Sequence, residues 1–583
     1  MRVPFGAHGW IPGALAAAAL CAAGCGPARP GAADGPRYFG RVSPPSGNVF
    51  RFNNGAEPEQ LDPALMSGQP DGRIARALFE GLTVYHPGTL APDAGQARSW
   101  DLSADGRIYT FHLRPEARWT DGSPVTARDF LWSWLRVLRP STGSRYASLL
   151  FPVAGAEAFS KGTLSDSTRV GLAAPDDTTF VVTLNAPTPY FVFLTGFYSL
   201  LPVPRAAVER WGERWVRPEH IVSNGPFTFH EWRPGDRIVL EKNLRYWDAA
   251  RVRLDRVECY AIEDLNTSMS LYRSGAVDWN PSGYVPTGYI PHLRRFADLS
   301  AGPFQGTYYY SMNVTRKPFD DPRVRLALNL ALDRDAIANK LLRGTRAPWG
   351  NITPRGYPGY EAPAGYGHDP ARARRLLAEA GYPGGRGMRR IEILITTSED
   401  HRRIAEAIQG MWRSELGVDV AVSNQEWGSY LEATTSLRYD VARRSWLGDY
   451  LDPNTFLAAL RGGDDNNRTG WADPGYDRLL DAAAAEPDPA LRLEMLARAE
   501  AVALERGPIL PIYHLRVYEM IKPYVRGLET NVLDIQELKY VWIDHSWRPG
   551  IGPAGARAAA AQARTSAPAA TDGRAAAPAG ARP

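Results

Sequence analysis

The residues best suited to chemistry in this 583-residue chain lie in one short segment, residues 441–453, which read VARRSWLGDYLDP. This segment could offer an acid for an ammonium group, a strand edge for an extended backbone and a pocket for variable side chains, all within about a dozen residues. These are the requirements of a peptide-binding site rather than of a catalytic one. The alternative for Asp449 is that it only caps a turn near Asp452-Pro453.

Motifs for covalent or metal-assisted catalysis are missing from the sequence. It contains no H-E-x-x-H, no G-x-S-x-G, no paired C-x-x-C and no phosphate-binding Walker pattern. Scattered pairs of Asp and Glu occur, as in any chain of this size. We therefore expect no enzyme activity, no cofactor and no metal site.

The composition is that of a globular chain with several domains. It is 44% hydrophobic, and its formal net charge of +4 is too small to imply nucleic-acid binding. The 17 Trp and 26 Tyr residues supply large rigid surfaces, most of them expected in the core. Cys259 is the single cysteine of the body and lies in the strand-like run VECYAI. We expect it to be a small buried side chain rather than a nucleophile.

The N-terminus has the features of a bacterial export signal. A short positive region precedes an apolar stretch at 11–23, which is too short to span a membrane comfortably as a permanent helix. The next residues, AAGC, resemble a lipobox in which Cys25 is lipidated, although Ala22 stands where Leu is usual. A plainly cleaved secretory signal is the alternative. Residues 26–45 are expected to form a flexible tether, and residues 548–583 a disordered tail.

Local patterns predict an α/β body. Residues 109–113 alternate as a half-buried strand does, and Thr126 with Asp129 forms a capping box at the start of a helix at 130–138. A strand at 391–397, a helix at 401–416 and a strand at 418–422 make a βαβ unit, which implies a parallel sheet. The pairs Asp321-Pro322 and Asp369-Pro370 are expected to begin two further helices, with Pro at the first helical position.

The strand, the W-x-D-G-x-P-x-T-A-x-D-F turn and the helix within residues 100–140 closely resemble the signature of solute-binding proteins of peptide ABC importers. Further segments resemble landmarks of this family, in the family's order. They are EPEQLDP at 57–63, ALFEG at 77–81, VSNGP at 222–226, PFDDPRVR at 318–325, LLAEAGY at 376–382 and NQEW at 424–427. The resemblance covers roughly 46–547 and is strongest to the oligopeptide-binding branch.

The resemblance implies a two-lobed periplasmic-binding-protein-like α/β fold, class II or cluster C, with an extra third domain. By this analogy the first lobe is discontinuous and the lobes close on the ligand. The implied ranges are 46–75, 195–302 and 514–547 for lobe I, 76–194 for the extra domain and 303–513 for lobe II.

The resemblance also implies roles for individual residues. Asp449 falls on the aspartate that binds the α-amino group of the ligand, where a charge-assisted contact contributes about 1.5–3 kcal/mol. The remaining positions fall on residues that contact the ligand's main chain, side chains or carboxylate. They are Ser445, Trp446 and Leu447 for the main chain, Trp427, Tyr513 and Glu57 for side chains, and Arg443 and His401 for the carboxylate of shorter and longer ligands.

Each of three positions also has a simpler interpretation on its own. Arg443 could form a surface salt bridge, His401 could be a solvated residue at a helix start, and Glu57 could be solvated surface. Those alternatives need no ligand.

Three positions depart from the family pattern. Leu342, followed by Arg343, stands where close relatives have a lysine for a mid-length carboxylate, so the preferred ligand length can differ. A cysteine pair of some relatives falls on Gly306 and Leu447. Pro58 is expected in the first ligand-facing strand, where it cannot donate a backbone hydrogen bond.

These features together indicate a lipid-anchored receptor outside the cytoplasmic membrane, or in the periplasm, that captures short peptides. The expected partners are an inner-membrane ABC permease complex and, through the lipid anchor only, the membrane; the receptor itself is expected to be a monomer. A scaffold dedicated to one ligand (a murein peptide, a dipeptide, a nickel chelate or another solute) is the alternative within the family. A secreted hydrolase and a chaperone-like periplasmic protein are alternatives from other classes.

Overall fold

The computed structural model describes residues 36–549 except 67, 397, 426 and 465. The predicted export signal with Cys25, the first half of the predicted tether (residues 26–35), and all but the first two residues of the predicted tail therefore lie outside the described residues. Residues Tyr38–Arg548 form one compact unit.

The largest sheet has 11 strands in the order β15-β14-β16-β12-β17-β11-β1-β10-β9-β8, with β13 paired to β17. Its strands are β1 (Val49–Asn53), β8 (Phe227–Arg233), β9 (Arg237–Lys242), β10 (Arg256–Tyr260), β11 (Trp279–Asn280), β12 (Leu299–Met312), β13 (Ala347–Pro348), β14 (Ile391–Thr396), β15 (Val420–Gln425), β16 (Val441–Leu447) and β17 (Ile509–Ile521).

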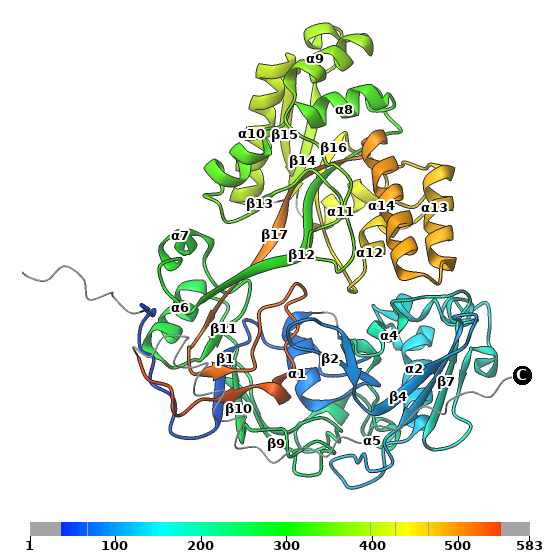
Figure 1. The fold of residues 1–583 in the computed structure, drawn as a ribbon, viewed down its shortest axis with the longest axis vertical. Helices are drawn as coiled ribbons and strands as arrows, with labels where there is room; N and C mark the ends of the chain where they lie inside the picture. The colour runs from blue at the N-terminus through cyan, green and yellow to red at the C-terminus, as the bar shows by residue number, and fades with distance from the viewer. Residues whose placement is uncertain (1–35, 67, 397, 426, 465, 550–583) are drawn as a thin grey trace, which may run out of the picture. The chain divides into compact units, whose positions relative to one another are not determined.

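Two long antiparallel strands, β12 and β17, lie at the middle of this sheet (Figure 1). Their pairing is irregular between Pro303 and Thr307, where the register shifts. The predicted lobe boundaries at 302/303 and 513/514 fall inside these two strands. The division into lobes stays a prediction, and it implies that β12 and β17 carry the chain between them.

The predicted βαβ unit is confirmed. Strands β14 and β15 are parallel neighbours, and α10 (Glu399–Leu416) connects them. The helix begins two residues earlier than predicted because Ser398 caps it, accepting a hydrogen bond from the backbone N–H of His401. Helices α8 (Pro322–Leu330) and α9 (Pro370–Glu379) begin at Pro as predicted, with Asp321 and Asp369 as their caps.

A separate four-stranded sheet lies within the range predicted for the extra domain. It has the order β4-β5-β7-β6, with β4 (Ala97–Leu102), β5 (Ile108–Leu113), β6 (Leu172–Ala173) and β7 (Thr179–Thr183). Helix α2 (Ala127–Leu138) follows with the predicted capping box: the Asp129 carboxylate accepts a hydrogen bond from the Thr126 backbone N–H at 2.7 Å. Its Trp134 is fully buried and donates to the Leu200 carbonyl at 2.9 Å.

The remaining helices and short strands complete the body. They are α1 (Gln69–Leu78), α3 (Ala156–Ser160), α4 (Phe191–Leu194), α5 (Arg205–Trp211), α6 (Leu265–Ser274), α7 (Ile290–Leu293), α11 (Trp427–Thr435), α12 (Asn454–Leu457), α13 (Pro474–Ala485), α14 (Pro489–Arg506), β2 (Thr83–Tyr85), β3 (Pro92–Ala94), β18 (Val525–Arg526) and β19 (Trp542–Ile543).

Two of the family-like segments meet at Glu80, directly after α1. The carboxylate of Glu80 is buried and pairs with Lys539 at 3.1 Å. Asn224 accepts from the Glu80 backbone N–H at 3.0 Å and donates to the Glu80 carbonyl at 3.0 Å. Gly225 lies so close to Leu78 that a Cβ there would be 2.6 Å from its backbone carbon. The motifs ALFEG and VSNGP thus serve packing.

Two expectations about single residues are decided by the fold. Cys259 is buried in β10, as expected, and burial raises the pKa of its thiol well above the ordinary value. The placement of Pro58 in a strand is wrong. Strand β1 ends at Asn53, and Gly55 then takes a left-handed φ of +85° against the Tyr284 ring, which turns the chain away before Pro58.

Candidate functional site

Strand β16 has one paired edge and one edge that is mostly unpaired. It pairs with β12 over its whole length, from Val441 opposite Met312 to Leu447 opposite Gly306. On the other side its ladder with β14 covers Val441 and Ala442 alone among the described residues. The Arg443 carbonyl accepts a hydrogen bond from the Tyr430 hydroxyl. The backbone from Arg444 to Leu447 therefore presents a free edge on that side, which can accept an extended chain as an additional strand.

Asp449 lies in the turn that follows β16, and Gln305 holds that turn in place. The Gln305 carbonyl accepts from the Gly448 backbone N–H at 2.9 Å, and its side-chain amide donates to the Tyr450 carbonyl at 2.5 Å. The backbone N–H of Asp449 donates to the Thr455 hydroxyl at 3.1 Å. The position of the Asp449 backbone is thus determined from both sides.

The carboxylate of Asp449 is left without a protein partner. It is partly buried, and burial raises its pKa to about 6. Among the described residues it has no hydrogen bond and no ion pair, and Asp452 instead caps the next turn by accepting from the Asn454 backbone N–H at 2.9 Å. A desolvated carboxylate without a counter-charge is a site for a cation.

Arg443, which also lies on β16, packs against a cluster of aromatic side chains from the strands β12 and β17. Its guanidinium lies over the Tyr308 ring at 4.7 Å, and Tyr308 stacks on Tyr513 with centroids 4.6 Å apart and planes at 12°. Arg443 is not a surface salt bridge: no described carboxylate lies within ion-pair distance, and its buried Nε has no hydrogen-bond partner. Its charge is therefore free to meet an anion from outside.

His401 joins this cluster from the first turn of α10. Its ring centroid is 5.8 Å from that of Tyr308, and its Nδ1 lies 3.2 Å from the Thr396 hydroxyl. Burial and the nearby Arg443 charge lower its pKa to about 4. His401 is thus a partly buried neutral ring at neutral pH, and not a solvated residue at a helix start.

The strand alternation separates Trp446 from the other predicted residues of β16. Ser445 lies on the Arg443 side, at 3.5 Å from its guanidinium, and Leu447 is 49% exposed. Trp446 packs on the opposite face, in a cavity wall shared with Tyr309 and Phe456, and its buried indole N–H lacks a partner. Trp446 can thus line a pocket only on that second face.

Two predicted residues stand apart from this group. Both carboxylate oxygens of Glu57 are used locally, accepting from the Trp232 indole at 2.9 Å and from the Gly235 backbone N–H at 2.6 Å. Trp427 begins α11, but its side chain lies outside the described part of the structure. Within the described ranges Glu57 forms no hydrogen bond or ion pair with β16.

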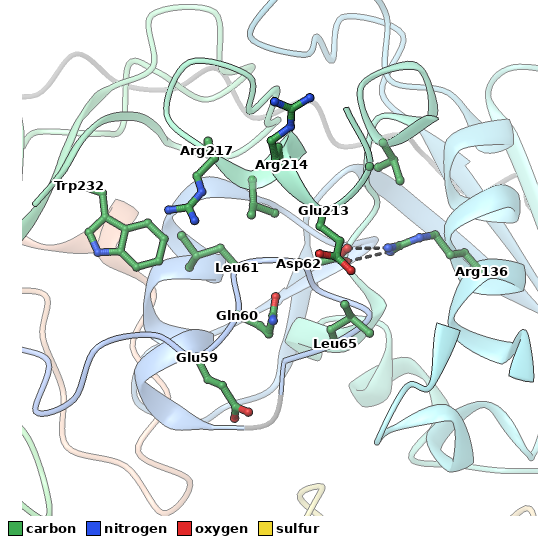
Figure 2. Close-up of a pocket in the computed structure, with 13 residues that line it drawn as sticks. Glu59, Gln60, Leu61, Asp62, Leu65, Arg136, Glu213, Arg214, Arg217 and Trp232 are labelled. Carbon is green, nitrogen blue, oxygen red and sulfur yellow. Dashed lines mark hydrogen bonds and ion pairs between the residues drawn. The ribbon is translucent and has the colours of Figure 1, made fainter. Parts of the chain in front are cut away.

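A cavity of about 510 Å³ lies elsewhere and shares no lining residue with β16. Figure 2 shows Asp62 and Arg136 side by side among its lining residues, where they form an ion pair at 2.5 Å. Trp215 also donates to Asp62 at 3.0 Å, so the acid is fully engaged. The carboxylate of Asp62 in this pocket is thus paired, whereas the carboxylate of Asp449 is unpaired in the described structure.

The sequence reasoning missed Tyr308, Tyr190 and Tyr450. Tyr308 could have been found from the run TYYYSM, since period-2 alternation places residues 308 and 310 on one face. Tyr450 stacks on Tyr190 with centroids 4.2 Å apart and planes at 9°, which ties the turn of Asp449 to a segment some 260 residues earlier. No sequence pattern near either tyrosine predicts that contact.

Among the described residues no group of acidic, His or Cys side chains is arranged to hold a metal ion. The helices described here also include none with the length and apolar character needed to cross a membrane.

Comparison with known proteins gives consistent matches. Residues 92–468 match the family model described as "Bacterial extracellular solute-binding proteins, family 5 Middle". The periplasmic oligopeptide-binding protein OppA of Salmonella typhimurium is 36% identical over 485 residues, covering 82% of this chain and 88% of that protein. The probable deoxycholate-binding periplasmic protein YgiS of Escherichia coli is 34% identical, covering 82% and 90%.

A solved structure of a relative confirms the predicted fold class. The crystal structure of Haemophilus influenzae OppA in complex with the peptide RPPGFSPFR superposes with a TM-score of 0.71 at 33% identity, covering 86% of this chain and 100% of that one. The α/β, two-lobed periplasmic-binding-protein-like fold with an additional domain is therefore shared.

Proposed function

Because the chain belongs to the bacterial extracellular solute-binding proteins of family 5, we propose that it captures short peptides and delivers them to an ABC importer. The observation that carries the proposal is the Asp449 carboxylate, desolvated and without a partner, directly beyond the free edge of β16. An ammonium group is the cation that every free peptide carries next to a backbone able to form such a ladder.

The same geometry orients the ligand. A peptide whose ammonium group meets Asp449 and whose backbone follows the free edge of β16 brings its carboxylate toward Arg443. Six residue steps separate the two, which is at most about 20 Å of chain. Peptides of about three to five residues fit within that span. Main-chain pairing and one ammonium contact leave the side chains of the ligand largely unconstrained, which favours broad specificity.

The finer parts of the proposal concern transport and location. Ligand binding stabilises a closed arrangement of the two lobes, and the permease recognises that arrangement. The chain is held outside the cytoplasmic membrane, or in the periplasm, by a lipid on Cys25, which its AAGC motif supports. Mass spectrometry of the mature N-terminus tests the anchor. We expect its mass to be increased by the lipid, and the increase to be lost in Cys25→Ser.

Native mass spectrometry of the protein as purified tests the ligand class. We expect a spread of added masses, each of which sequences as a short peptide with a free amine. A single added mass would instead indicate a dedicated ligand. The likeness to a deoxycholate-binding relative makes a non-peptide ligand the alternative, but deoxycholate has no ammonium group to satisfy Asp449.

A further inference from the structure

A second arginine, Arg346, approaches the aromatic cluster of Arg443 from another element. It directly precedes β13, whose Pro348 pairs with Tyr513 of β17. Its guanidinium carbon lies 6.0 Å from the centroid of the Tyr513 ring. Arg443 lies over Tyr308, which stacks on the same Tyr513. Each guanidinium thus lies near one ring of the same pair of stacked tyrosines.

The loop that carries Arg346 is held by hydrogen bonds to its carbonyl groups. Arg294 donates to the Gly344 carbonyl at 2.6 Å, and Arg403 donates to the Leu341 carbonyl at 3.4 Å. The Thr345 hydroxyl closes the turn by donating to the Leu342 carbonyl at 2.7 Å. Hydrogen bonds therefore hold the turn that precedes Arg346 in a fixed conformation. Leu342 itself is buried in the core and supplies no charge.

Neither guanidinium has a counter-charge. In the described ranges no carboxylate lies within ion-pair distance of Arg346 or Arg443. The Arg346 guanidinium donates a hydrogen bond to the neighbouring Thr345 carbonyl at 3.1 Å and also interacts with the Tyr513 hydroxyl. His401, the third basic side chain of the cluster, adds no positive charge at neutral pH. Two cations without a counter-charge beside one pair of aromatic rings form a positive region, which a bound anion neutralises.

We propose that Arg346 and Arg443 together form a two-carboxylate site, which makes the protein select peptides that end in aspartate or glutamate. The α-carboxylate of such a residue meets one guanidinium and its side-chain carboxylate meets the other, in charge-assisted hydrogen bonds. This inference rests on the proposed function and names its ligand class. It also accounts for the Leu342 position, because the positive charge there is supplied from Arg346 instead.

Isothermal titration calorimetry of the full chain with Ala-Ala-Glu and Ala-Ala-Gln tests the inference, since the two peptides differ only in the side-chain carboxylate. The wild type is expected to bind Ala-Ala-Glu about 10- to 100-fold more tightly. Arg346→Gln should remove most of that preference while Ala-Ala-Gln still binds, which shows that the variant is folded. Arg346→Lys keeps the charge but not the planar fork and should retain part of the preference.

Arg343→Gln is the matched control, because Arg343 is an exposed arginine three residues earlier in the same loop. It should leave the preference intact. Equal affinity of the wild type for both peptides overturns the two-carboxylate site and leaves peptide capture standing. A preference that survives Arg346→Gln overturns the role of Arg346. Failure of the wild type to bind either peptide, at any length from three to five residues, overturns the proposed function and this inference with it.

Discussion

Replacing Asp449 with asparagine tests the ammonium site most directly. The side chain keeps its shape and its surroundings, because Gln305 and Thr455 hold the turn through backbone groups. Only the charge is lost. We expect Asp449→Asn to weaken the binding of free-amine peptides strongly and of N-acetylated peptides little.

The magnitude follows from the environment of the carboxylate. A hydrogen bond to a charged group contributes about 1.5–3 kcal/mol net, and every 1.4 kcal/mol is tenfold in affinity. The Asp449 carboxylate has no competing partner in the described structure, so the full contribution is available to the ligand. Its partial burial excludes the screening that would weaken an exposed pair. We expect a loss of about 10- to 150-fold for the free-amine peptide.

Calorimetric titration at pH 7.5 with Ala-Ala-Ala and its N-acetyl derivative measures this loss. Four affinities, two proteins against two peptides, isolate the contribution of the ammonium contact as a coupling energy. Glu116→Gln, which removes one negative charge from an exposed glutamate of the four-stranded region, is the control for long-range charge effects and should change neither affinity. Equal losses for the free and the acetylated peptide would remove Asp449 from its assigned role.

Three further predictions follow from the same structure. First, only the ionised Asp449 binds an ammonium group, and its pKa is about 6. The Kd of a free-amine peptide, measured by calorimetry, should therefore rise about tenfold when the pH is lowered from 7 to 5. A Kd that does not change with pH would refute the assignment. Secondly, the pKa of Asp449 is about 6 in the folded protein, above its ordinary value of 3.8, so between pH 3.8 and pH 6 the folded state binds more protons than the unfolded state and loses stability as the pH rises. Asp449→Asn should therefore stabilise the ligand-free protein by about 1–3 kcal/mol at pH 7 and by much less at pH 4. Urea unfolding at the two pH values measures the difference. Thirdly, Glu80→Gln removes the carboxylate that pairs with the buried Lys539 and should lower the free energy of unfolding by about 3–5 kcal/mol with peptide affinity unchanged. A loss below about 1 kcal/mol would contradict the role of the pair.

Local patterns in the sequence were sufficient for individual elements. The capping box at Thr126, the βαβ unit of β14, α10 and β15, and the buried Cys259 all follow from residues within about 30 positions of each other. Helical and strand periodicities are properties of contiguous chain, which is why these predictions held. The family resemblance, in turn, identified the fold class and pointed to residues 441–453.

The resemblance misplaced Pro58, because the path of the chain there depends on a distant residue. The chain leaves β1 earlier, at a glycine packed against Tyr284, which lies more than 200 residues away. The surroundings of Glu57 are likewise formed by distant residues, since its carboxylate accepts hydrogen bonds from Trp232 and Gly235.

The sequence by itself determined which residues carry charge and the type and approximate position of several strands and helices, among them β14, α10 and β15. Only the tertiary structure decided which of those charges remain unpaired. We propose Asp449 and Arg443 as binding groups because the pairing of β14 with β16 stops at Ala442 and because no acid or base from the rest of the described chain forms an ion pair with them. Such pairing depends on contacts between segments some 50 residues apart, as in Ile393 opposite Val441, which periodicity and propensity do not encode.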